Sequence, residues 1–159
     1  AEAIDPALFS LLRRHRTRGG VTLLTPDEAV AAYRALQRGE VLAIVADRLI
    51  AGPGVEVPFC GGRRVMPVGP AAFARRARAP LVVASMVRQP FGPPWYLGIT
   101  EPAHLPGPSA EAMTALVAAD FSRLLRQYPD QWFVFQPDWV GGEPIGETVA
   151  LPGHARPAS

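Results

Sequence analysis

The sequence is poor in cysteine, and this excludes two kinds of site. Cys60 is the single cysteine among 159 residues, so the chain can form no internal disulfide and no cysteine-rich zinc site. It lies in a Phe-Cys-Gly turn, where a packing role is favoured over a nucleophilic one.

Long apolar runs are also absent, since no stretch approaches the roughly 18 residues that a membrane-spanning helix needs. No signal peptide is recognisable at the N-terminus and residue 1 is not Met, so we expect a processed chain or part of a longer one. With 48% apolar and 19% charged residues, the composition is that of an ordinary globular protein. We expect one domain over residues 1–140 and a flexible tail over residues 141–159, where Gly, Pro and small residues prevail.

Lysine is missing altogether, so all sixteen basic residues are arginine and the net charge is +2. Genome composition could produce this bias, although arginine also suits bidentate recognition of phosphate. A small positive charge fits an anionic lipid surface. Nucleic-acid binding is disfavoured, because no recognition motif is present and no aromatics alternate with the arginines near the N-terminus.

One stretch organises the chain, and it begins with six apolar residues, Val41 to Ala46. Such a short, β-branched run predicts a strand buried on both faces, with Asp47 and Arg48 at its carboxyl end. After a Gly-Pro-Gly loop, the valines on either side of Glu56 predict that its carboxylate points away from their buried face. Because ligands of open α/β sheets bind beyond the carboxyl ends of strands, this stretch predicts one wall of an active site.

Helix signals flank this stretch. Asp5-Pro6 predicts a helix that ends at Gly19-Gly20, and Thr25-Pro-Asp-Glu28 predicts another that runs to Gly39 with Val30, Tyr33 and Leu36 inward. Between them, Val21 to Leu24 predicts a short strand.

Beyond a turn at Gly61-Gly62, Pro70 begins a helix whose first backbone donors, near Arg63 and Arg64, could hold an anion. The remaining elements are a buried strand from Leu81 to Val87, a hairpin partner from Trp95 to Thr100, and a long helix that starts at Ser109. Asp120 interrupts the apolar stripe of that helix, which runs from Met113 to Tyr128, and needs a partner such as an arginine. The order of elements predicts an α/β or α+β layer.

Four stretches carry a family resemblance: Gly39 to Arg48, Gly54 to Gly61, Gly69 to Pro80 and Tyr128 to Trp132. They resemble the carboxyl-terminal half of the bacterial lysophospholipid acyltransferase superfamily. The likeness covers residues 1 to 140 and is strongest to the branch of lipid A lauroyl and myristoyl acyltransferases and phosphatidylinositol mannoside acyltransferases. It implies a mixed, mostly parallel sheet flanked by helices, present here in part.

The resemblance also implies a reaction: transfer of a fatty acyl chain from acyl-CoA or acyl carrier protein to a hydroxyl of a membrane glycolipid. The acceptor would be of the phosphatidylinositol mannoside or lipid A type, at the cytoplasmic face of the inner membrane, with no metal and no cofactor. By position, Glu56 would be a catalytic residue, the acidic residue of the family's Gly-Val-Glu-Val run, which contacts the acceptor or completes a charge relay with the histidine. Asp47 and Arg48 would shape the mouth of the site and bind substrate. Arg63 and Arg64, near the predicted anion site, are the other candidates for substrate binding.

The catalytic pair of such enzymes is a His-x4-Asp motif, which this sequence lacks. His15, His104 and His154 are followed five positions later by Gly20, Ser109 and Ser159. We therefore expect the motif to lie upstream and the chain alone to be nearly inactive. The alternative is a non-catalytic homologue that binds lipid or a partner.

Overall fold

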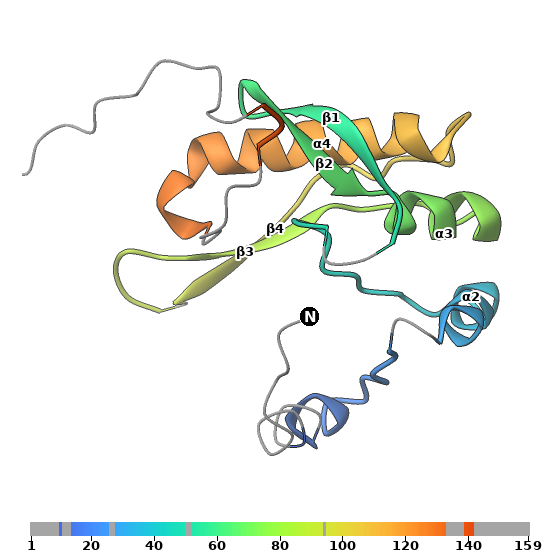
Figure 1. The fold of residues 1–159 in the computed structure, drawn as a ribbon. Coiled ribbons are helices and arrows are strands. Elements are labelled where there is room, and N and C mark those ends of the chain that lie inside the picture. Colours follow the sequence, from blue (N-terminus) through green and yellow to red (C-terminus); the bar gives the residue numbers. More distant parts are fainter. Residues whose placement is uncertain are drawn as a thin grey trace, which may run out of the picture.

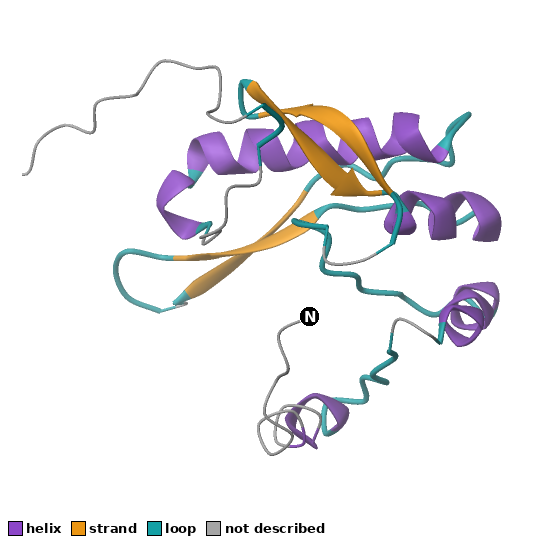
Figure 2. Cartoon of the chain, in the orientation of Figure 1, coloured by secondary structure: helices purple, strands orange, loops and turns teal. Residues whose placement is uncertain are grey.

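The computed structural model describes residues 10, 14–25, 28–49, 52–93, 95–132 and 139–141. Helices and strands follow one another along the chain (Figures 1 and 2), so the expectation of a fold that mixes helices with strands is confirmed. The named elements are α2 (Ala29–Gln37), β1 (Gly54–Phe59), β2 (Gly62–Pro67), α3 (Gly69–Ala77), β3 (Ala84–Arg88), β4 (Tyr96–Thr100), α4 (Ala110–Gln127) and the 3-10 turn η1 (Pro129–Gln131). Both sheets are two-stranded and antiparallel, β1 with β2 and β3 with β4, so the mostly parallel sheet is not confirmed.

The core forms where the β1–β2 hairpin lies across α4 (Figure 1). The Ser109 hydroxyl caps α4 by accepting a hydrogen bond from the Ala112 amide at 3.0 Å, as the sequence predicted. The predicted stripe of α4 is buried at Met113, Val117 and Leu124, but Leu116 is exposed. The stripe therefore faces the hairpin over most, but not all, of its predicted positions.

The β1–β2 hairpin alternates inward and outward side chains with a period of two. Val57 is buried and Glu56 is exposed, which confirms the predicted orientation of this pair. Cys60 and Gly61 both have positive φ, the geometry of a tight two-residue hairpin turn, and the Cys60 amide donates to the Ser122 hydroxyl of α4 at 3.0 Å. The sequence placed Cys60 in a turn but put the tight turn at Gly61-Gly62, one residue later than observed, and it missed β2, which begins at Gly62.

Glycine is required at the start of β1, because the chain there passes close to two neighbours. A Cβ on Gly54 would lie 2.6 Å from Cγ1 of Val65 and 2.7 Å from Cδ2 of Leu49. Leu49, which follows Asp47 and Arg48, therefore lies against the start of the hairpin.

The predicted strand from Val41 to Ala46 is wrong: these residues form no strand, and only Ala46 is buried. Val41 is 95% exposed and Val45 86% exposed. A strand exists only where a neighbour accepts and donates its ladder hydrogen bonds, and no described strand lies alongside this run. The predicted strand from Val21 to Leu24 is wrong for the same reason.

The second hairpin, β3–β4, is confirmed, and its register pairs Arg88 with Tyr96 and Ala84 with Thr100. The prediction that Leu81 to Val87 is buried holds for one face alone. Leu81 and Val87 are buried, whereas Met86 on the other face is exposed.

The amino-terminal helices agree in part with the sequence. Residues 14–17 are helical and the chain turns at Gly20, while Asp5-Pro6 lies outside the described residues. The Thr25 amide donates to the Glu28 carboxylate at 2.8 Å, as a capping box requires, and α2 follows. Val30 is exposed, although it was predicted to face inward. The helix α3 begins at Gly69-Pro70, as Pro70 predicted. Residues 142–159, where a flexible tail was predicted, lie outside the described part of the chain.

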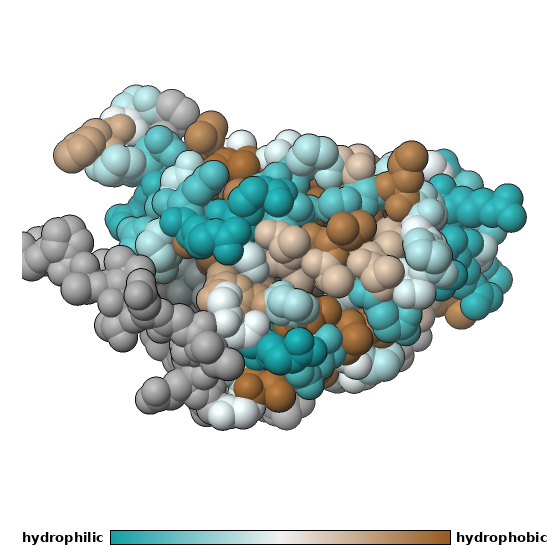
Figure 3. Space-filling model, turned by 90° about the horizontal axis from the view of Figure 1, so that it is seen from above, coloured by the Kyte–Doolittle hydropathy of each residue, from teal (hydrophilic) through white to brown (hydrophobic). Residues whose placement is uncertain are grey.

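No helix among the described residues is both long enough and apolar enough to cross a bilayer. Viewed from above, apolar side chains appear at the surface among polar ones (Figure 3).

Candidate functional site

Glu56, the predicted catalytic residue, lies on the outer face of the β1–β2 hairpin. The register pairs Glu56 with Val65 and Pro58 with Arg63, so Glu56 and Arg63 share this face as diagonal neighbours. Nε of Arg63 and Oε1 of Glu56 form an ion pair, and both side chains are exposed. Arg63 thus orients an accessible carboxylate.

Arg64 lies on the opposite, inner face and is completely buried. Its guanidinium carbon lies 4.8 Å from the ring centroid of Trp132 and 5.2 Å from that of Phe59, within the range of a cation–π interaction. Neighbouring positions of one strand point to opposite faces, so the two adjacent arginines have different surroundings. A direct contact of Arg64 with substrate stays a prediction.

Asp47 joins the cluster around Arg64. The Trp132 indole Nε1 donates a hydrogen bond to Oδ2 of Asp47 at 3.3 Å, while the next residue, Arg48, is exposed. Trp132, 85 positions from Asp47 in the sequence, therefore links Asp47 to Arg64. Four of the five predicted site residues fall into two groups. Glu56 and Arg63 form an outer pair, and Asp47 and Arg64 form an inner cluster with Phe59 and Trp132. Arg48, which is exposed, belongs to neither group.

Binding of an anion by the first backbone amides of α3 stays a prediction. Val68 precedes the helix, and no side chain caps its first amides. Within the described residues no three His, Cys, Asp or Glu side chains gather as metal ligands would, and the metal-free expectation stays a prediction.

Sequence reasoning missed a network of charged residues under α4. His104 Nε2 lies 2.5 Å from Oδ2 of the buried Asp120, and Arg123 pairs with both Asp120 and Glu101, the latter at 2.8 Å. The hydrogen bonds that Arg123 donates to Glu101, the larger effect, and to Asp120 raise the pKa of Arg123 above its usual value. The sequence did predict an arginine for Asp120, but His104 lies 16 positions away, a spacing with no local signal.

His104 also has a structural role, because its backbone bridges that of Leu81 through hydrogen bonds of 2.8 and 2.9 Å. The His104–Asp120 contact therefore attaches the connector before α4 to both the second hairpin and the helix. It has the residue types of a catalytic dyad, but Arg123 occupies the other oxygen of Asp120.

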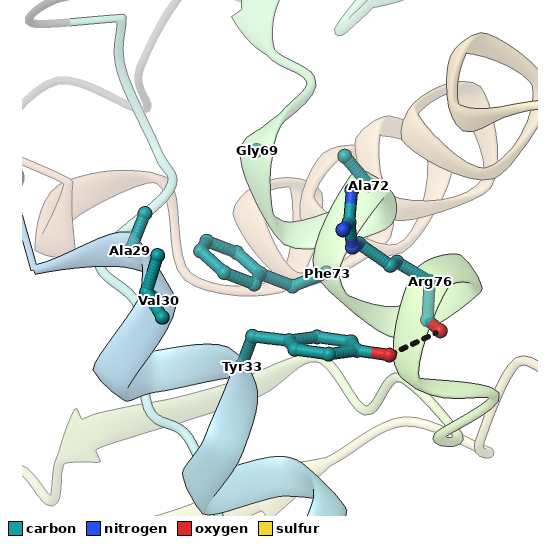
Figure 4. Close-up of a pocket in the computed structure, with 7 residues that line it drawn as sticks. All are labelled: Ala29, Val30, Tyr33, Gly69, Ala72, Phe73 and Arg76. Atoms are coloured by element: carbon teal, nitrogen blue, oxygen red, sulfur yellow. Dashed lines mark hydrogen bonds between the residues drawn. The ribbon is translucent and has the colours of Figure 1, made fainter.

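A further feature missed from the sequence is an apolar groove of about 380 Å³ between α2 and α3 (Figure 4). Tyr33 and Phe73 face each other across it, and the Tyr33 hydroxyl donates to the Arg76 carbonyl at 3.4 Å. The Arg76 guanidinium carbon lies 5.1 Å from the centroid of the Tyr33 ring, at the rim. The other lining residues are Ala29, Val30, Gly69 and Ala72.

Comparison with known proteins shows which protein family this chain is similar to. A model of the family described as bacterial lipid A biosynthesis acyltransferase matches residues 3–140. The phosphatidylinositol mannoside acyltransferase of Mycobacterium tuberculosis is 29% identical over 105 residues, which are 66% of this chain and 33% of that protein. The protein of the same name in Mycolicibacterium smegmatis is 28% identical over 115 residues, 72% of this chain and 37% of that protein. The chain thus spans about a third of the length of these curated relatives.

Proposed function

Because the chain belongs to the bacterial lipid A biosynthesis acyltransferase family, we propose that it forms part of a glycolipid O-acyltransferase that uses acyl-CoA or acyl carrier protein as donor. The resemblance to the two mannoside enzymes favours a phosphatidylinositol mannoside as acceptor over a lipid A precursor. The remainder of the sheet, with parallel strands, and the His-x4-Asp base would lie in sequence outside this chain. No metal and no cofactor take part.

The observation that carries the proposal is the accessible carboxylate of Glu56 in the run Gly54-Val-Glu-Val57. β1 presents it on the outer face, and Arg63 orients it from the neighbouring strand. A carboxylate in this position can accept hydrogen bonds from sugar hydroxyls and keep one of them directed towards the reacting carbonyl.

The proposed acyl transfer needs no reactant besides the thioester donor and the acceptor hydroxyl. The acceptor hydroxyl oxygen forms a bond to the thioester carbonyl carbon, and the carbon–sulfur bond breaks. A histidine base takes the hydroxyl proton and returns it to the departing thiolate. Glu56 positions the hydroxyl or the protonated base throughout this exchange.

The inner cluster holds together the segments on either side of Glu56. Asp47 and Arg64 both contact Trp132, so the loop before β1 and the underside of β2 are held against one ring. Arg48 is exposed beside this loop and is available to a phosphate of donor or acceptor. The enzyme acts as a peripheral protein at the cytoplasmic face of the inner membrane.

The test is acyl transfer by the complete gene product and by this chain, with Glu56→Gln in both. Acyl-CoA and acyl carrier protein serve as donors, and a mannosylated phosphatidylinositol and a lipid A precursor as acceptors. Glu56→Gln should lower kcat/KM of the complete product by about 10²–10⁴-fold, the range for a proton-transfer or positioning group. The unfolding midpoint should stay unchanged, since exposed ion pairs contribute little to stability.

Glu40→Gln is the matched control, because Glu40 is also an exposed glutamate paired with an arginine, Arg38, at 2.6 Å. It should leave acyl transfer unchanged. Activity of Glu56→Gln within about twofold of the wild type would remove Glu56 from the mechanism.

A second function, a non-catalytic homologue that binds lipid or a partner, is favoured by one observation. None of the three histidines of this sequence stands in a His-x4-Asp motif. Lipid binding by the complete product, without transfer from either donor, would replace the enzyme by this function.

A further inference from the structure

The turn of the β3–β4 hairpin carries three large aromatic side chains in solvent. Phe91 is 90% exposed, Trp95 61% and Tyr96 59%. We call these three residues the aromatic tip. A cluster of large aromatic side chains that is exposed to solvent indicates an interaction site.

The base of the β3–β4 hairpin is attached to η1 by two hydrogen bonds. The Gln131 side chain hydrogen-bonds both backbone groups of Arg88, accepting from its amide at 2.6 Å and donating to its carbonyl at 3.1 Å. Beyond this anchor the Gln89 amide donates to the Trp95 carbonyl at 2.8 Å and closes the turn. In Figure 1 the turn reaches past the end of α4. The tip is therefore a fixed projection rather than part of the core.

The charges around the tip have one predominant sign. The strands β3 and β4 carry Arg88 and no acidic residue. Arg126 is exposed in the last turn of α4, and the neighbouring η1 carries one carboxylate, that of Asp130. An anionic surface is attracted by this distribution.

Tryptophan and tyrosine combine a large apolar ring with a polar atom, and for that reason they collect at the boundary between lipid headgroups and acyl chains. We propose that the aromatic tip inserts into the interfacial layer of an anionic lipid bilayer, with Arg88 at the level of the headgroups. This inference rests on the proposed action on a membrane glycolipid, and it assigns the membrane contact to one hairpin. Insertion there fixes one end of the enzyme at the surface that contains its acceptor.

The test measures binding of the protein to vesicles of phosphatidylcholine with about one third phosphatidylglycerol. Wild-type protein should sediment with these vesicles, and bromine-labelled acyl chains should quench part of its tryptophan fluorescence. That quenched part should be absent in Trp95→Phe, because the other two tryptophans, Trp132 and Trp139, pack against the core cluster beside Phe59. The triple variant Phe91→Ser, Trp95→Ser, Tyr96→Ser should partition at least about tenfold more weakly, a loss of about 1.4 kcal/mol.

Leu105→Ser is the matched control, since Leu105 is an exposed apolar residue on the connector outside the hairpin. It should change partitioning by less than about twofold. Because all four positions are exposed, circular dichroism spectra of the variants should match that of the wild type.

Three results would overturn the inference. These are partitioning of the triple variant equal to that of the wild type, binding without quenching of Trp95, and no binding of the wild type to vesicles. Concentration-dependent dimers that the triple variant abolishes, in the absence of any vesicle binding, would assign the tip to a second copy of the chain instead.

Acyl transfer separates this inference from the proposed function. The triple variant in the complete product should act normally on acceptor dispersed in detergent and poorly on acceptor in vesicles. Insertion of Trp95 without transfer by the wild type on either form would leave the membrane contact standing and remove the enzymatic role.

Discussion

Two neighbouring segments of this protein are both rich in valine but have different structures. Val41 to Ala46 is a run of apolar residues that forms no strand, whereas β1, only eight positions further on, is a regular strand in the core. β1 pairs with β2 and packs on α4, so its backbone and its apolar side chains are both satisfied. The upstream run has neither partner among the described residues. Composition made both segments able to form strands, and the neighbours decided which one did.

The comparison is tested most strongly by amide hydrogen exchange. The amides of Val57 and Arg64, which face each other in the β1–β2 ladder, should exchange only when the core unfolds. Those of Val41 to Val45 should exchange nearly as fast as in an unstructured peptide. The difference should exceed about a thousandfold for a core stability of about 5 kcal/mol. Protection of the upstream run equal to that of β1 would show that a partner strand is present in solution.

Substitution of methionine compares a buried inner face with an exposed one. Met66 on β2 is 1% exposed and Met86 on β3 is 70% exposed. Met66→Ala should lower the free energy of unfolding by about 2–5 kcal/mol, because it leaves a cavity between the hairpin and α4. Met86→Ala should change it by less than about 0.5 kcal/mol. Urea denaturation measures both, and equal losses would mean that the second hairpin is as fully packed as the first.

The smallest expected effect concerns the helix under the hairpin. The Glu111 backbone amide, the larger effect, and the Ser109 side chain lower the pKa of the Glu111 carboxyl at the start of α4. A carboxyl with a lowered pKa stabilises the fold above its unfolded value, near 4.5, and this contribution is lost as pH falls through the folded pKa. Glu111→Gln should therefore reduce thermal stability slightly at pH 7 and not at pH 3. An equal difference at both values would assign the effect to packing instead.

Local features of the sequence predicted much of the fold. The start of α4 at Ser109, a turn within one residue of Cys60-Gly61, the proline at the start of α3 and the β3–β4 hairpin were all visible in short stretches. Each depends on backbone preferences or on contacts between residues close in sequence, which is the information that a sequence displays. Errors arose where pairing with a distant segment decides the structure, at Val41 to Ala46 and at β2.

In the candidate site, too, some features could be predicted from the sequence and others only from the tertiary structure. The alternation of Val55, Glu56 and Val57 by itself determined that the carboxylate faces outward, because successive residues of a strand point to opposite sides. The order of the four family stretches determined the family. Only the tertiary structure separated Arg63 from Arg64, joined Asp47 to Trp132 across 85 positions, and placed His104 against Asp120. The physical reason is that these contacts depend on how the hairpins pack against α4, and sequence spacing carries no record of that packing.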